Sequence, residues 1–183
     1  MDYRNNIPNI NLGSLDKLIA KPYPLPNAKG PDFIVIGAQK SATTWLWEQL
    51  NNSPSIAMTP IKEIHYFDRN LPNSNLPSVD PATRLSDESW LNKVRADLQN
   101  TIDIGDQQLL NWMMHYHFSI WDETWYKRLF DLAPTHQSAG EITPRYAICD
   151  GQAIHHMHTV APTAKLIFCI RNPVDRFWSQ CLM

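Results

Sequence analysis

The sequence has few cysteines and no long apolar run. Its three cysteines, Cys149, Cys169 and Cys181, are widely spaced and form no Cys-x-x-Cys pair. This usage is typical of a reducing compartment and not of a disulfide-stabilised secreted domain. Residues 1–20 lack the apolar stretch of a signal peptide, and no apolar run approaches the length of a membrane span. These absences predict a cytoplasmic protein without a membrane-spanning segment.

The chain also lacks an excess of positive charge. Its net charge is −2 and its pI is near 6.4, which argues against nucleic-acid binding, because that function requires a basic face. Its histidine clusters, at 115–117 and 155–158, have no cysteine or acidic residue at a spacing typical of zinc sites. We therefore expect no metal site. The oligomeric state is not readable from these features.

The length of 183 residues fits one domain with a real core. Residues 1–31, rich in proline and asparagine, are expected to form an N-terminal arm with a short helix near 15–20. Residues 32–183 form the predicted domain. A loop over 69–87 is expected to cover part of the site. Further helices are predicted at 86–98, 104–116, 123–132 and 151–160.

Seven tryptophans are a high number for this length, and several lie close together in the sequence. Trp112, Trp121 and Trp125 cluster with other aromatic residues. Such a cluster either packs in the core or offers flat surfaces to a sugar or an adenine ring.

The first segment that carries chemistry is an apolar run followed by a polar turn. Residues 33–36 have the length and β-branched composition of a buried parallel strand. Gly37 permits a tight turn, and a helix is predicted from Thr43, with Trp45, Leu46, Trp47 and Leu50 directed inward. The turn then points backbone N–H groups outward, where an anion can bind. Lys40 adds a positive charge, and Ser41, Thr43 and Thr44 add hydroxyl groups.

This turn is not a Walker A loop. That motif requires a lysine directly after its second glycine, followed by serine or threonine. Lys40 instead comes three residues after Gly37, and no Gly-Lys-Ser/Thr sequence follows. A Mg²⁺-ATP kinase is therefore a weaker alternative.

A second segment repeats the pattern near the end of the chain. Residues 166–170 read as another buried strand. Arg171 follows it, at the edge of an open α/β sheet where ligands bind, and its planar guanidinium suits a phosphate. Asn172 and Pro173 suit the start of a helix, and Ser179 lies two turns into it. Two such sites suggest a ligand with two separate phosphates.

The two segments together resemble PAPS-dependent sulfotransferases. Residues 37–44, Gly-Ala-Gln-Lys-Ser-Ala-Thr-Thr, resemble the family's 5′-phosphosulfate loop, G-x-x-K-x-G-T-T. Residues 171–179 resemble its 3′-phosphate motif, an arginine with a serine eight residues later. The resemblance extends from Asp32 to the end of the chain. Ala42 departs from the pattern, which commonly has glycine; at a helix start we expect this change to cost little.

The resemblance implies an α/β fold, a P-loop-like three-layer domain with a central parallel sheet. It implies PAPS (3′-phosphoadenosine 5′-phosphosulfate) as co-substrate and no metal. The residues it assigns to PAPS are Gly37, Gln39, Lys40, Ser41, Ala42, Thr43, Thr44, Trp45, Arg171 and Ser179.

Residues 62–68, Lys-Glu-Ile-His-Tyr-Phe-Asp, resemble a stretch of the heparan-type and related bacterial members. Sulfuryl transfer needs a group that accepts the acceptor's proton and a cation near the departing bisphosphate. The resemblance assigns the first role to Glu63, and Lys40 suits the second. His65 orients Glu63 or the acceptor, or it packs beside Tyr66. The plainer alternative for Lys62 and Glu63 is a surface ion pair.

Residues 140–146, Gly-Glu-Ile-Thr-Pro-Arg-Tyr, resemble another element of the family, with Glu141 ending a short strand at the ligand edge. Heparan-type members often have lysine where this chain has Ile142, which argues against a glycosaminoglycan acceptor; Arg145 could compensate in part.

The predicted function is sulfuryl transfer from PAPS to a hydroxyl or amine, with a glycan or small molecule as acceptor. A non-catalytic, degenerate nucleotide-binding relative is the alternative. Because the helix begun at Pro173 has no stop signal before Met183, the domain is expected to be truncated at its C-terminus, with weak PAPS binding.

Overall fold

The structure is a computed structural model that describes residues 28–71 and 75–182. Their centre is a four-stranded, all-parallel sheet in the order β2-β3-β1-β4. The strands are β1 (Phe33–Gly37), β2 (Ile56–Met58), β3 (Ser138–Ile142) and β4 (Lys165–Phe168). The sheet confirms the predicted α/β class. The predicted helix near 15–20 and nearly all of the predicted arm lie outside the described residues.

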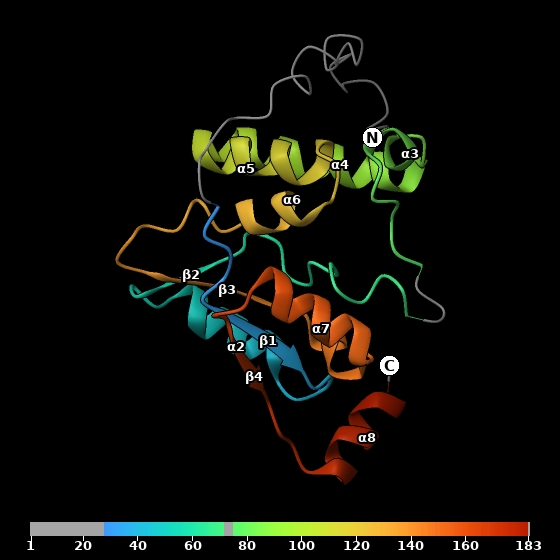
Figure 1. Cartoon of the computed structure of the whole chain (residues 1–183). Coiled ribbons are helices and arrows are strands. Elements are labelled where there is room, and N and C mark those ends of the chain that lie inside the picture. Colours follow the sequence, from blue (N-terminus) through green and yellow to red (C-terminus); the bar gives the residue numbers. More distant parts are fainter. Residues whose placement is uncertain (1–27, 72–74, 183) are drawn as a thin grey trace, which may run out of the picture.

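β1, one of the two inner strands of the sheet, matches the strand predicted at 33–36. Ile34 and Val35 are fully buried, because their side chains point to opposite faces of the sheet and helices cover both. On one face, α2 (Thr43–Asn51) packs Leu46, Trp47 and Leu50 against Val35. On the other face, α7 (Gly151–Val160) contributes buried side chains to the hydrophobic core cluster that contains Ile34. The result is the expected three-layer arrangement, visible in Figure 1.

A group of helices lies beyond the sheet, at the top of Figure 1. It consists of α3 (Pro81–Leu85), α4 (Glu88–Ile104), α5 (Gln107–Phe118) and α6 (Glu123–Arg128). Asp87 caps α4 by accepting hydrogen bonds from the N–H groups of Ser89 and Trp90. The helix runs on to Gly105, whose φ of 74° ends it, so α4 is longer than predicted and α5 starts later. No helix among the described residues has the length and apolarity needed to cross a membrane.

The aromatic cluster is core. Trp112 stacks on Tyr116 with ring centroids 5.2 Å apart, and Trp121 stacks on Trp125 at 4.9 Å. All four are buried. The cluster therefore joins α5 and α6 to the rest of the fold and offers no flat surface to a ligand.

The predicted loop 69–87 contains α3 and an arginine that anchors it. The Arg84 side chain donates hydrogen bonds to the carbonyls of Ser78 and Val79 and to those of His117 and Ser119 at the end of α5. Its guanidinium also lies 4.0 Å from the ring centroid of Trp121. The Arg84 side chain is only 1% exposed, and its hydrogen bonds fix this segment to the end of α5. That the loop covers an acceptor stays a prediction.

The strand predicted at 166–170 is real but is not buried. β4 is one of the two edge strands of the sheet, and Leu166, Ile167 and Phe168 are 39–51% exposed. Cys169, expected inside the strand, follows it and is half-buried. An apolar run predicts a strand, but burial depends on what packs against its faces, and β4 lacks such cover in the described residues. The helix after it, α8 (Pro173–Cys181), likewise has no buried residue.

A candidate active site at the carboxyl edge of the sheet

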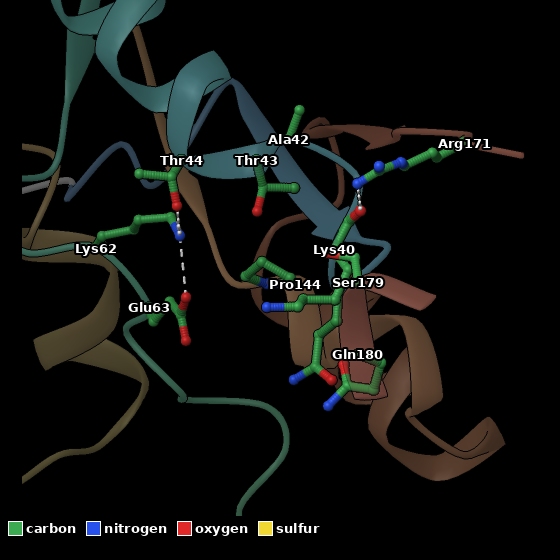
Figure 2. A pocket seen from close by; sticks show the side chains of 11 residues that line it. Lys40, Ala42, Thr43, Thr44, Lys62, Glu63, Pro144, Arg171, Ser179 and Gln180 are labelled. Carbon is green, nitrogen blue, oxygen red and sulfur yellow. Dashed lines mark hydrogen bonds and ion pairs between the residues drawn. The ribbon is translucent and has the colours of Figure 1, made fainter. Parts of the chain in front are cut away.

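A cavity of about 530 Å³ opens where the parallel strands end, the edge at which open α/β sheets bind ligands. This volume lies within the usual range for small-molecule sites. Figure 2 shows the lining side chains. They come from four separate segments: Gln39, Lys40, Ala42, Thr43 and Thr44; Lys62 and Glu63; Pro144; and Arg171, Ser179 and Gln180.

The loop between β1 and α2 is shaped to receive an anion. Gly37 has φ of +146°, and a Cβ there would lie 2.6 Å from the Ala147 Cβ and 2.8 Å from the Pro144 carbonyl oxygen, so only glycine fits. Helix α2 begins without a side-chain cap, which leaves its first-turn N–H groups open toward the cavity. The Ser41 hydroxyl is buried and has no hydrogen-bond partner.

Backbone strain is concentrated in the two loops that flank the cavity. The non-glycine residues with left-handed φ in the described part of the chain are Lys40 (62°), Ala42 (59°), Glu63 (62°) and His65 (55°). Such strain often gathers at functional sites. Ala42 does sit at the helix start, as its N-cap, but it keeps the left-handed geometry that glycine prefers. The expectation that its substitution for glycine costs little is therefore wrong.

The second predicted phosphate motif lies beside the first. Asn172 caps α8 by accepting a hydrogen bond from the Val174 N–H, with Pro173 in the first turn, as predicted. Arg171 Nη1 donates to the carbonyl oxygen of Lys40 at 3.0 Å, joining residues 131 positions apart in the sequence. Ser179 lines the cavity from α8. The fold thus places both predicted phosphate sites on one pocket.

Glu63 faces this pocket from the loop after β2. Its backbone N–H donates to the Ile142 carbonyl at 2.9 Å, which fixes the loop to the end of β3. Lys62 Nζ donates to Glu63 Oε1 at 3.0 Å and to Thr44 Oγ1 at 3.2 Å. His65 Nε2 lies 3.5 Å from Glu63 Oε2. The hydrogen bond from His65, together with Lys62, lowers the pKa of Glu63 to about 2 despite partial burial, so the carboxylate is ionised at neutral pH.

His65 lies behind Glu63 and holds it. Its Nδ1 is 2.7 Å from Oδ2 of Asp68, a fully buried carboxylate that also lies 3.7 Å from Arg145 Nε. Burial disfavours the imidazolium, but the hydrogen bonds to Asp68 and Glu63 outweigh burial and raise the pKa of His65 to about 9. The charged ring therefore links the two carboxylates at neutral pH.

Comparison with known proteins now identifies the family. The sequence model of the sulfotransferase family matches residues 31–183. This chain belongs to the sulfotransferase family. A crystal structure of a sulfotransferase from Alicyclobacillus acidocaldarius is similar, with 27% identity and a TM-score of 0.53. The match covers 83% of this chain and 49% of that one, so this chain spans about half the length of that protein. No curated protein matches.

Within this sulfotransferase fold, some predicted residues do not line the cavity. Gly37 is the last residue of β1, Ser41 is buried in the loop that follows, and His65 lies behind Glu63. Trp45 was expected to point inward, but its side chain is 61% exposed, because in the first turn of α2 it faces away from the sheet. Lys62 lines the cavity, although the only role predicted for it was a surface ion pair. Its position next to Glu63 was the one signal in the sequence that pointed to the site.

Glu141 lies near the carboxyl end of β3, as predicted, but its side chain is fully buried and does not line the cavity. It accepts hydrogen bonds from the hydroxyls of Tyr126 (2.6 Å), Thr143 (2.7 Å) and Tyr146 (3.2 Å). Burial raises its pKa to about 7, against the effect of these hydrogen bonds. The Tyr146 hydroxyl also accepts the Tyr66 backbone N–H at 2.9 Å, so this buried cluster supports the loop that carries Glu63.

Two further expectations concern charge and metals. Arg145, considered as a compensating cation for the acceptor, instead points to Asp68. Among residues 28–71 and 75–182, no three His, Cys, Asp or Glu side chains gather as a possible metal site.

Proposed function

We propose that this chain transfers a sulfuryl group from PAPS to a hydroxyl or amine of an acceptor. The observation that carries the proposal is the hydrogen bond from Arg171 to the Lys40 carbonyl. It unites the two phosphate motifs around one cavity, and the Glu63 carboxylate lines the same cavity. A donor with separate 5′ and 3′ phosphates matches this arrangement.

The residues present suit the donor. The first turn of α2, Lys40 and the unpartnered Ser41 hydroxyl would bind the 5′-phosphosulfate through N–H, ammonium and hydroxyl donors. Arg171 and Ser179 would bind the 3′-phosphate, with the guanidinium as a bidentate donor. Trp45 exposes an indole ring beside the loop, and an adenine could stack on it.

In the proposed reaction the acceptor oxygen or nitrogen attacks the sulfur. The bond between sulfur and the bridging phosphate oxygen breaks, and its electron pair leaves with the bisphosphate. Lys40 stabilises the charge that develops there, and Glu63 takes the proton from the acceptor. His65 and Asp68 act as positioning residues, because they hold the Glu63 carboxylate from behind.

The acceptor class proposed is a neutral glycan or small molecule. Ile142 is fully buried and contributes no contact to the cavity, and the cations near Glu63 are paired: Lys62 with Glu63, His65 with Glu63 and Asp68, and Arg145 with Asp68. An acidic polysaccharide would need cations that are not already paired.

Calorimetric titration with adenosine 3′,5′-bisphosphate (PAP), with ATP and Mg²⁺ in parallel, tests the donor site. We expect PAP to bind and ATP to bind more weakly, with PAP binding reduced at least about tenfold by Lys40→Ala or Arg171→Ala. Lys165→Ala, at the exposed start of β4, is the matched control. A preference for ATP, or PAP binding that both site variants retain, would reject the proposal.

The base is tested separately by Glu63→Gln. PAP release from PAPS would be followed across a panel of sugar, phenol and amine acceptors. We expect turnover to fall about 10²–10⁴-fold while PAP affinity is retained. Unchanged turnover would show that another group accepts the proton. PAP binding without turnover in the unaltered chain would support the non-catalytic alternative.

A further inference from the structure

Lys62 connects the two halves of the cavity. Its ammonium has three N–H donors, of which one reaches Glu63 Oε1 at 3.0 Å and another reaches Thr44 Oγ1 at 3.2 Å. Thr44 lies in the first turn of α2, where the proposed function places the phosphosulfate. Figure 2 shows the Lys62 nitrogen between these two partners. An anion bound at the first turn of α2 would therefore come within reach of the same ammonium.

The two lysines of the cavity differ in their pairing. Lys62 forms an ion pair with Glu63, and its side chain is only 20% exposed. For Lys40, the described residues provide no ion-pair partner. Of the two lysines, a bound donor would therefore meet one without an ion-pair partner among the described residues and one that it must share with the base.

The ion pair with Lys62 also affects the basicity of Glu63. While both Lys62 and His65 contact it, the carboxylate is strongly stabilised in its charged form, which makes it a weak proton acceptor. Loss of one cation, and arrival of a negative group nearby, both favour proton uptake. The base would thus become stronger when the donor is present.

Resting on the proposed function, we propose that Lys62 is a catalytic residue that transfers its hydrogen bond from Glu63 to the sulfuryl group when PAPS binds. Thr44 keeps the ammonium in place during this exchange. No bond to Lys62 forms or breaks: it donates a hydrogen bond to sulfuryl oxygen, while the acceptor proton goes to the released Glu63 carboxylate. Donor binding and activation of the base are thereby coupled through one side chain.

The test compares PAPS with PAP, which lacks the sulfuryl group, by calorimetry without acceptor. Lys62→Met removes the charge and keeps the length of the side chain, and Lys62→Arg restores a cation. Lys165→Met is the control. We expect Lys62→Met to lower PAPS affinity about tenfold more than PAP affinity, as for one lost charge-assisted hydrogen bond. Lys62→Arg should restore part of the difference, and Lys165→Met should leave both affinities unchanged.

The outcomes separate this inference from the function on which it rests. If the unaltered chain binds PAP and PAPS but Lys62→Met weakens both equally or neither, the role of Lys62 is refuted and the donor site stands. If the unaltered chain binds neither ligand, both proposals fail. Circular dichroism and thermal unfolding of each variant exclude misfolding as the cause of a lost affinity.

Discussion

Replacing Ala42 by glycine should stabilise this protein, although Ala→Gly substitutions in helices usually do the opposite. Ala42 is the N-cap of α2, with φ of 59° and ψ of 28° and no side-chain cap. The left-handed conformation costs an L-residue about 1–2 kcal/mol. Glycine avoids this cost but loses about 0.4–1 kcal/mol through the greater freedom of the unfolded chain. The free energy of unfolding should therefore rise by about 0.5–1 kcal/mol.

Thermal unfolding measures this effect. A gain of this size corresponds to an increase in Tm of about 1–4 °C for a chain of this length. The matched control is Ala96→Gly, at an exposed position inside α4, where glycine should lower the free energy of unfolding by about 1 kcal/mol. If Ala42→Gly destabilises the protein as much as Ala96→Gly, the left-handed geometry of the loop between β1 and α2 is wrong. The anion site built on it would then need revision.

Two further predictions concern buried polar groups. Arg84→Met should lower the free energy of unfolding by about 3 kcal/mol, because it leaves buried carbonyl oxygens without hydrogen-bond donors. The control, Arg95→Met at an exposed position on α4, should change the free energy of unfolding little. Equal effects of the two substitutions in denaturant unfolding would contradict the anchoring role of Arg84. Glu141 has a pKa raised to about 7, so protonation favours the folded state. The stabilisation that the buried Glu141 contributes to the free energy of unfolding is fully present below about pH 4.5. It is lost as the pH rises through 7, and the free energy of unfolding then falls by up to about 3 kcal/mol. Glu141→Gln should remove that loss from the pH profile of urea unfolding; an unchanged profile would refute it.

The features that sequence alone predicted best are local. β1, the turn at Gly37 and the start of α2 follow from an apolar run, a glycine and hydroxyl residues in immediate succession. Helix α7 has the predicted bounds, 151–160. In these segments the signal and the structure involve the same few residues, so no distant partner had to be known.

The features that sequence missed depend on distant partners. Glu141 is buried because Tyr126 and Tyr146 supply hydroxyl donors from two other elements. Lys62 has a place in the site because the fold brings its ammonium within 3.2 Å of Thr44 Oγ1, in a segment 18 residues away in the sequence. For Trp45, the pattern of α2 did not distinguish the helix face against the sheet from the outer face. Burial and pairing at these positions are properties of the assembled fold.

The position of β1 in the sheet also has a consequence for folding. It is synthesised first among the strands but pairs with β3 and β4, and the loop after it meets Arg171 only 131 residues later. At about 5–20 residues per second, the ribosome needs about 7–26 seconds to make that stretch. Parallel pairing between such distant segments is intrinsically slow. The cavity that Lys40 and Arg171 line therefore cannot form before Arg171 has been synthesised, and the apolar β1 stays unpaired at least until β3 has been made.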